Sequence, residues 1–288
     1  MKKARKITAL ILCVLFAFFS LAMSSSAAGE KFVVLGDSIA EGIDGIGGDT
    51  SKSYAVLVAE EKGYELFNFA SGGYNSSHLL SQVRNNAEVR AAIAGADIIS
   101  ISIGGNDFLN ADNLITVMFR ILVGDNSLAE EHIETIRANY NAAMDIIIGL
   151  NPDALIIVQT LYNPFYGVPV FGDVYDTGVS LLNACFYDYL AEHAGAYKIA
   201  DVYGAFKGRE GLVYDDFVHP SVAGHAVIAR VVAYTIDGVT TELPPVENVN
   251  LNIFQKIAVF ISTLFAYLKY ALSIMSLWEV IMVLYNRV

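Results

Sequence analysis

Short apolar runs alternate with longer stretches of helical periodicity between residues 31 and 237. The runs are rich in β-branched residues and almost continuously hydrophobic, which is typical of strands buried on both faces of a sheet. The predicted strands are Phe32–Leu35, Glu65–Phe69, Ile98–Ile103, Leu155–Gln159 and Tyr197–Ile199. The predicted helices are Ser53–Lys62, Ser76–Ile93, Ser127–Leu150, Val179–His193 and Ser221–Ile236.

This alternation predicts a single α/β domain over residues 29–237. Strands joined through helices pair in parallel by right-handed crossovers, so the helices cover both faces and the domain has three α/β/α layers. Ligands of such sheets bind beyond the carboxyl ends of the strands. Residues that follow a predicted strand directly are therefore the first candidates for a functional site.

The pattern changes at the N-terminal end of the chain. Residues 1–28 have a basic start, an apolar run from Ile7 to Ala22 and small residues that end at Ala28. These features predict a signal peptide cleaved after Ala28, with an uncleaved anchor as the alternative. We therefore expect an exported protein.

The C-terminal end departs from the domain pattern as well. Residues 238–250 are polar, contain Pro244 and Pro245, and are predicted to be a linker. Residues 251–288 then form a predicted apolar, amphipathic helical segment. Charged residues interrupt the stretch 251–285, so it lacks the uncharged run of about 18–20 residues that a spanning helix needs. The segment is a candidate membrane anchor that either lies in the membrane interface or spans the membrane. The alternative is a helix or helical hairpin docked on the domain or on a sister subunit.

Composition narrows the classes of function. Hydrophobic residues make up 55% and the mean hydropathy is +0.47, in keeping with apolar segments outside the core. The chain has 18 basic and 30 acidic residues, a net charge of −12, which disfavours nucleic-acid binding. Only Cys185 follows the predicted cleavage site, so we expect no internal disulfide. No cluster has metal-ligand spacing, and we expect neither a metal nor another cofactor.

Four short motifs stand at strand ends or in loops on one side of the predicted sheet. They are Gly36-Asp37-Ser38 after the first strand, Asn68-Phe69-Ala70-Ser71-Gly72-Gly73 after the second, Gly104-Gly105-Asn106-Asp107 after the third, and Asp215-Asp216-Phe217-Val218-His219-Pro220 before the last helix. A serine that opens a helix has an exposed hydroxyl, although Asp-Ser is also a common turn and cap sequence. An asparagine amide can donate to a developing oxyanion.

The last motif supplies a base and an acid. A carboxylate three residues before a histidine can hold one imidazole nitrogen while the other faces a nucleophile. Each motif alone is weak, because turns and caps use the same residues. Together they supply a nucleophile, a base, an acid and oxyanion donors, which is the set that acyl transfer requires.

These segments resemble the four sequence blocks of the GDSL/SGNH hydrolases, and the likeness spans residues 31–237. The resemblance implies a flavodoxin-like α/β/α fold with Ser38 as nucleophile, His219 as base and Asp216 as its partner. It further implies an oxyanion hole whose three donors are the Ser38 N–H, the Gly73 N–H and the Asn106 amide. Ala70 departs from the pattern, since glycine is common there, and Gly72 precedes the matching Gly73. Asp215 is expected to be a hydrated neighbour.

The resemblance implies an exported serine esterase or lipase that acts through an acyl-enzyme, and the chain looks like the lysophospholipase-like branch. Two apolar segments, Phe108–Asp125 and Tyr162–Tyr175, are expected to rim the site. One interpretation is that they form a wall or lid for an acyl group. The other is that they are an ordinary core helix and a rigid loop. The substrates favoured are lipid or lysophospholipid esters. Carbohydrate or cell-wall O-acetyl esters are the alternative, and a non-catalytic binding protein is a remote one.

Overall fold

The computed structural model describes residues 29–109, 117, 120–121, 124–167, 171–216 and 218–239. The predicted signal peptide, most of the predicted linker and the predicted C-terminal segment lie outside these ranges. None of the helices within the described ranges combines the length and the apolar character that a membrane span needs.

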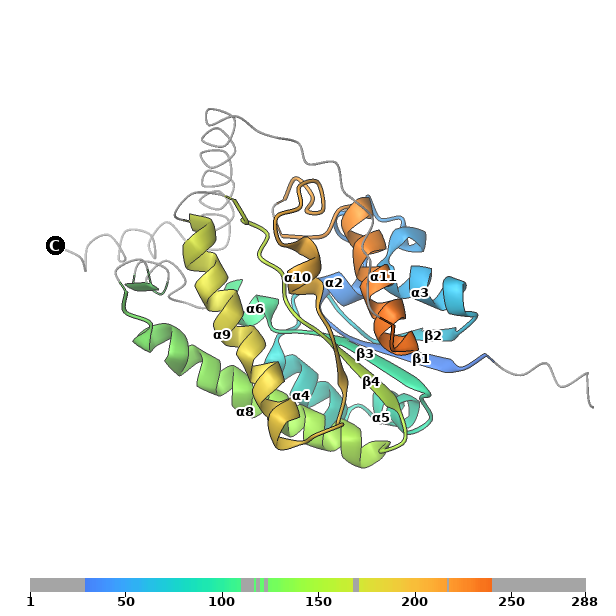
Figure 1. Ribbon diagram of the computed structural model, residues 1–288. Helices are drawn as coiled ribbons and strands as arrows, with labels where there is room; N and C mark the ends of the chain where they lie inside the picture. Colours follow the sequence, from blue (N-terminus) through green and yellow to red (C-terminus); the bar gives the residue numbers. More distant parts are fainter. Residues whose placement is uncertain are drawn as a thin grey trace, which may run out of the picture.

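Five parallel strands form the centre of the domain (Figure 1). They are β1 (Lys31–Gly36), β2 (Glu65–Asn68), β3 (Ile98–Ser102), β4 (Leu155–Gln159) and β5 (Lys198–Ala200). Their order in the sheet is β2-β1-β3-β4-β5. In the register, Val33 lies beside Phe67 of β2 and beside Ile99 of β3. The parallel sheet confirms the predicted fold class.

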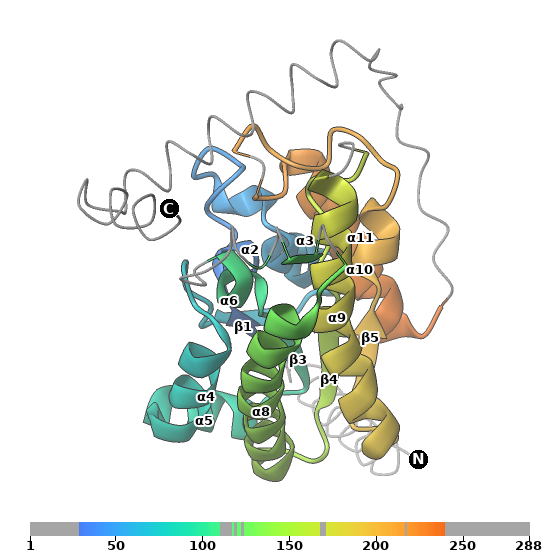
Figure 2. The same cartoon turned by 90° about the vertical axis from the view of Figure 1, so that its left-hand side faces the viewer.

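Helices cover both faces of the sheet, and Figures 1 and 2 show the three layers. One face carries α4 (Ser76–Asn85), α5 (Ala87–Ala94), α8 (Ser127–Leu150) and α9 (Phe171–Glu192). The other carries α3 (Tyr54–Lys62), α10 (Val202–Phe206) and α11 (Val222–Asp237). The short elements α2 (Ser38–Glu41), η1 (Thr50–Lys52) and α6 (Gly105–Leu109) lie in the connections.

The strand period of two divides the core between the two layers. Val33 and Leu35 of β1 pack under the α8 layer, whereas Phe32 and Val34 pack under the α11 layer. All four side chains are fully buried. The central strands β1, β3 and β4 are therefore apolar on both sides, which is why they form nearly continuous hydrophobic runs in the sequence.

Two predicted helices differ from the observed ones. The predicted helix Ser76–Ile93 is broken at Asn86, whose backbone is extended and whose side chain accepts the N–H groups of Glu88 and Val89, so that α5 starts there. The last helix before β5 begins at Phe171 rather than at Val179, so part of the segment predicted as a loop is helical. The short helices of three to five residues were not predicted because they are too short to show a period.

The strand order places a topological switch point between β1 and β3. The chain leaves β1 toward β2 on one side and returns to β3 on the other. Crossovers that depart in opposite directions leave a crevice outside the carboxyl ends of the two central strands. Ser38 follows β1 and Asn106 follows β3, so both residues stand at this crevice.

Candidate active site

Ser38 begins α2 at the end of β1, and a glycine makes the turn that presents it. Gly36 has a φ of 143°, and a Cβ there would lie 2.0 Å from the carbonyl oxygen of Ser102 on β3. Only glycine permits this approach of two backbones. The Asp37 N–H then donates to the same oxygen at 3.1 Å, and the Asp37 carboxylate caps α2 by accepting the Ile39 N–H at 3.1 Å. The turn is thus fixed on both sides of the serine.

His219 stands between Ser38 and Asp216. Its Nε2 lies 2.9 Å from the Ser38 Oγ, and its Nδ1 lies 2.7 Å from the Asp216 Oδ2. Because a carboxylate can only accept, Nδ1 carries the proton and Nε2 is left to accept from the serine. The structure brings these three predicted residues together, while Asp215 is exposed to solvent as expected.

The loop that carries His219 is rigid for local reasons. The Asp216 Oδ1 accepts the N–H groups of Val218 and His219, both at 3.0 Å. The His219 carbonyl accepts the Tyr214 N–H at 2.8 Å, and Val213 pairs with Pro220 in an antiparallel bridge. A carboxylate three residues before the histidine therefore orients both the backbone and the ring.

Charges around the imidazole favour its protonated form. Burial opposes the charge, but the hydrogen bond to Asp216 and the negative charges of Asp216, Asp44 and Asp37 outweigh it, so the pKa of His219 is raised. The pKa of Asp216 is lowered, since its hydrogen bonds from His219 and the loop backbone outweigh the effect of burial. Burial raises the pKa of Asp37 to about 7 despite the Ile39 N–H and the nearby His219.

The loop after β2 borders Ser38 and carries the predicted glycine donor. Gly73 has a φ of 78°, and a Cβ on Gly72 would lie 3.9 Å from the Ser38 Cβ. The Asn106 amide donates to the Tyr74 carbonyl at 2.8 Å, which joins the loops after β2 and β3. One N–H of that amide is thereby held, and the second is left for a ligand.

Glu41, which the sequence reasoning did not single out, fixes the same loop. Its Oε2 accepts the Gly72 N–H at 2.7 Å. The side chain of Asn68 adds a second link by donating to the Ala40 carbonyl at 2.9 Å. The helix that begins with Ser38 is thus bonded directly to the loop that holds Gly73. The only sequence signal was the position of Glu41 one turn after the serine.

Asp44 is a further residue that the sequence reasoning missed. Its Oδ2 lies 3.6 Å from the His219 Nε2, the nitrogen that faces Ser38. No sequence spacing relates it to His219, because the two residues belong to different loops. Within the described residues, no group of three His, Cys, Asp or Glu side chains is arranged to hold a metal ion.

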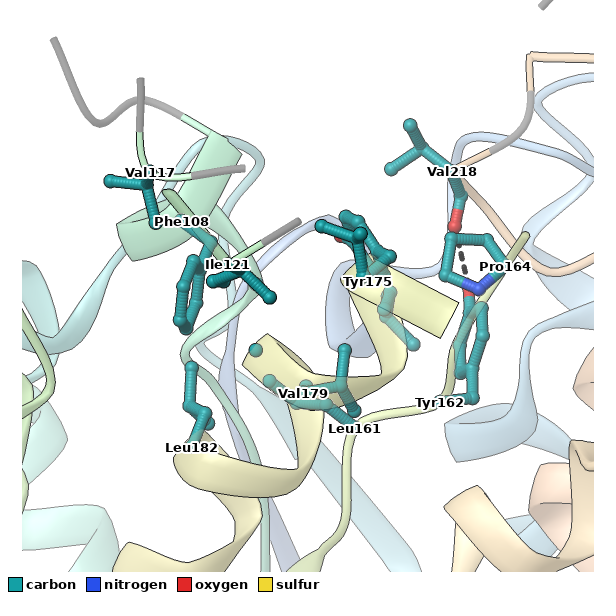
Figure 3. Close-up of a pocket in the computed structure, with 14 residues that line it drawn as sticks. Phe108, Val117, Ile121, Leu161, Tyr162, Pro164, Tyr175, Val179, Leu182 and Val218 are labelled. Carbon is teal, nitrogen blue, oxygen red and sulfur yellow. Dashed lines mark hydrogen bonds between the residues drawn. The ribbon is translucent and has the colours of Figure 1, made fainter. Parts of the chain in front are cut away.

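An apolar pocket opens beside Ser38 and His219 (Figure 3). Its lining includes Ile39, Val218 and Gly105, the chain neighbours of Ser38, His219 and Asn106. Among the described residues, those that line the pocket carry no charge. Figure 3 shows Leu161 and Tyr162 on the segment after β4, and Val179 and Leu182 on α9.

Both apolar segments that were predicted to rim the site contribute to this pocket. Phe108, Val117 and Ile121 come from the first segment, and Tyr162 and Tyr175 come from the second. Other parts of the two segments lie outside the described residues. The Tyr162 hydroxyl also donates to the Val218 carbonyl, so the pocket wall is bonded to the histidine loop.

A three-layer α/β/α domain with a serine, a histidine and a carboxylate in line at the switch point of a parallel sheet has the architecture of the SGNH hydrolases. The chain belongs to the GDSL-like lipase/acylhydrolase family, whose family model matches residues 34–227. This membership makes it a carboxylic ester hydrolase. The fold and the family confirm the resemblance inferred from the sequence blocks.

Solved structures of other proteins share this fold, and one curated protein is similar in sequence. The lipase Lip_vut3 from a goat rumen metagenome has 24% identity and a TM-score of 0.59, over 72% of this chain and 97% of that one. The phospholipase A1 of Streptomyces albidoflavus NA297 has 20% identity and a TM-score of 0.52, over 74% and 100%. The uncharacterized protein YpmR of Bacillus subtilis (strain 168) is 26% identical, over 68% of this chain and 77% of its own.

The pH dependence of hydrolysis should report the charges that face His219. These belong to Asp216 on its own loop, to Asp44 and to Asp37, while His225 on α11 has a pKa lowered to about 4 by burial and stays neutral. Because only neutral His219 accepts a proton, kcat/KM should rise with pH around a midpoint above about 6.5, the ordinary value for histidine. Asp44→Asn should move that midpoint to lower pH.

The control for this measurement is Asp49→Asn. It removes another carboxylate of the same loop, one that is paired with Lys52 at 3.0 Å. It should leave the midpoint in place. A midpoint that does not move in Asp44→Asn would show that the Asp44 carboxylate does not act on the imidazole.

The Glu41 link to Gly72 should matter for turnover more than for substrate binding. Glu41→Ala removes the bond that holds the loop of Gly73. Complete loss of an oxyanion donor lowers kcat by about 10²–10³-fold. A misplaced donor should therefore lower kcat by about tenfold to a hundredfold, with a smaller change in KM. Glu41→Gln keeps an oxygen acceptor and should recover most of the rate. Steady-state kinetics check this, and equal impairment of the two variants would contradict it.

Proposed function

We propose that this protein is a serine esterase of lipid acyl esters, including lysophospholipid esters, with Ser38 as nucleophile, His219 as base and Asp216 as orienting acid. The observation that carries the proposal is the line of two hydrogen bonds, 2.9 Å and 2.7 Å, that joins Ser38 to His219 and His219 to Asp216. The uncharged pocket that opens at Ile39 and Val218 supports an apolar acyl group.

The reaction proceeds in two stages. His219 accepts the proton of the Ser38 hydroxyl while the serine oxygen attacks the ester carbonyl, and the tetrahedral oxyanion is stabilised by the N–H groups of Ser38 and Gly73 and by the Asn106 amide. The carbon–oxygen bond to the alcohol breaks, and His219 gives the proton to the leaving oxygen. Water then attacks the acyl-enzyme, again with His219 as base, and releases the acid and free Ser38.

The local bonds support these roles. The Asn106 amide is oriented by the Tyr74 carbonyl, and the Gly73 turn is oriented through Glu41. Positioned donors stabilise a developing negative charge without reorganising during the reaction, which is the largest single contribution in many hydrolases. The raised pKa of His219 suits it to take up a proton and later to return it.

The proposal also covers where the hydrolysis takes place. The basic start, the apolar run and the small residues of 1–28 support export and cleavage after Ala28. The amphipathic stretch 251–285 supports a membrane surface as the place where lipid esters are met. Both segments lie outside the described residues, so this part of the proposal rests on the sequence.

The role of Ser38 is tested by Ser38→Ala on p-nitrophenyl acetate, butyrate, octanoate and palmitate. We expect kcat to fall by about 10⁴-fold or more, because the covalent step has no nucleophile, while thermal unfolding stays unchanged. Octanoate or palmitate should be the best substrate of the unmodified protein. Retained activity would refute the role of Ser38, and hydrolysis of acetate alone would favour removal of O-acetyl groups from carbohydrate.

The acyl pocket is tested by filling it from α9. Gly178 lines the pocket, and a Cβ there would lie 3.4 Å from the Phe108 ring. Gly178→Leu should lower kcat/KM for octanoate by about tenfold to a hundredfold and leave acetate nearly unchanged, since each buried methylene contributes about 0.8 kcal/mol. Gly149→Leu is the matched control, because Gly149 is helical and faces open space. Equal loss on both esters would contradict an acyl role for the pocket.

A further inference from the structure

A carboxylate beside His219, that of Asp44, has no bond-making or proton-transfer step in the proposed reaction. The Asp44 Oδ2 lies 3.6 Å from the His219 Nε2, and 56% of the Asp44 side chain is exposed. That nitrogen hands its proton to the leaving oxygen. A carboxylate at this distance therefore lies next to the path by which the alcohol departs, and it is open to contact from outside.

The backbone holds Asp44 in this position. The next residue, Gly45, has a φ of 78°, and a Cβ there would lie 2.2 Å from the Pro220 carbonyl oxygen and 3.1 Å from the His219 Cβ. The loop after α2 thus packs directly against the histidine loop, which only glycine permits. The carboxylate is attached to a backbone that is positioned relative to His219.

Within the described residues, neither lysine nor arginine neutralises Asp44, whose one charged neighbour is His219 when the imidazole is protonated. In the part of the chain that the structure describes, no lysine or arginine nitrogen lies within 4.0 Å of its carboxylate. Its loop neighbour Asp49 shows the contrast, since it is paired with Lys52 at 3.0 Å. The negative charge of Asp44 is therefore available to a ligand.

The acyl pocket and Asp44 divide the site into two chemically different parts. The residues that line the pocket in the described part of the chain are uncharged, and Asp44 is not one of them. An ester whose acyl chain fills the pocket directs its alcohol away from it, toward His219 and Asp44. Opposite charges at such a distance attract each other, and they do so more strongly near a protein surface than in bulk water.

We propose that Asp44 is a specificity-determining residue that selects esters whose leaving alcohol carries a cationic nitrogen close to the ester oxygen. This inference rests on the proposed function, because it assigns the alcohol side of that reaction. Choline and ethanolamine esters belong to this class. The group acts by attracting the cation before and during departure of the alcohol, while Ser38, His219 and Asp216 carry out the chemistry.

The test compares two esters that differ by one atom. Butyrylcholine and 3,3-dimethylbutyl butyrate share the acyl group and the shape of the alcohol, but the first has a quaternary nitrogen where the second has carbon. Release of butyrate by the full chain gives kcat/KM for each. The ratio of the two values cancels any change in the pKa of His219, because both substrates depend on the same base.

We expect the unmodified protein to prefer butyrylcholine by about three- to tenfold, and Asp44→Asn to lose that preference. Asp215→Asn, which removes another exposed carboxylate beside the site, should retain it. Added salt should weaken the preference, since exposed charges are screened. A ratio that is the same in Asp44→Asn and in the unmodified protein would overturn the inference.

A binding measurement separates this inference from the proposed function. If neither ester is cleaved in a Ser38-dependent way, the proposed function fails. The subsite is then tested by calorimetry, which gives the affinity of each ester for Ser38→Ala and for the double variant Ser38→Ala/Asp44→Asn. Tighter binding of butyrylcholine that disappears with Asp44→Asn supports the subsite. Equal affinity of the two esters for Ser38→Ala refutes it.

Discussion

The site depends on one hydrogen bond between residues from the two ends of the domain's sequence. Ser38 and His219 are 181 residues apart in sequence, and their side chains meet at 2.9 Å. Two backbone contacts make this meeting possible: the turn at Gly36 approaches β3, and the loop at Gly45 approaches Pro220. Each contact needs a residue without a Cβ. Close backbone packing therefore brings the two side chains within hydrogen-bond distance.

The three carboxylates near that hydrogen bond differ in their burial and in their hydrogen bonds. Asp216 is hydrogen-bonded to the ring and to the backbone, so it stays ionised and keeps the imidazole oriented. Asp37 is only 2% exposed, and burial brings its pKa to about 7. Asp44 is half exposed and faces the other ring nitrogen. Three carboxylates in three environments thus act together to raise the pKa of one imidazole.

The sequence contained the sheet and most of the residues that meet at its edge. Strands buried on both faces leave continuous apolar runs, so the prediction of Leu155–Gln159 matched the structure at both ends. Ser38 and Asn106 follow from motif position, because carboxyl ends of parallel strands share one edge, and His219 follows from the carboxylate three residues before it. The helix break at Asn86 was missed because its apolar repeat continues across the cap.

Contacts between loops could not be read from spacing. Glu41 meets Gly72 and Asp44 meets His219 only after the sheet has brought separate connections together. Neither residue lies in a repeating pattern, and each is a plausible surface acid in the sequence. The start of α9 at Phe171 was missed because glycine and proline in this region suggested a loop. The apolar residues of this part of the helix face the pocket, a contact that sequence spacing does not show.

Under the proposed function, the bond between Tyr162 and the Val218 carbonyl links binding of the acyl chain to the position of the base. Tyr162 lines the acyl pocket, and Val218 is the residue before His219. An acyl chain that presses on this ring also bears on the peptide that carries the base. Part of the affinity for the chain is then expressed in the rate of bond cleavage instead of in the strength of the Michaelis complex, which is how remote contacts come to raise kcat.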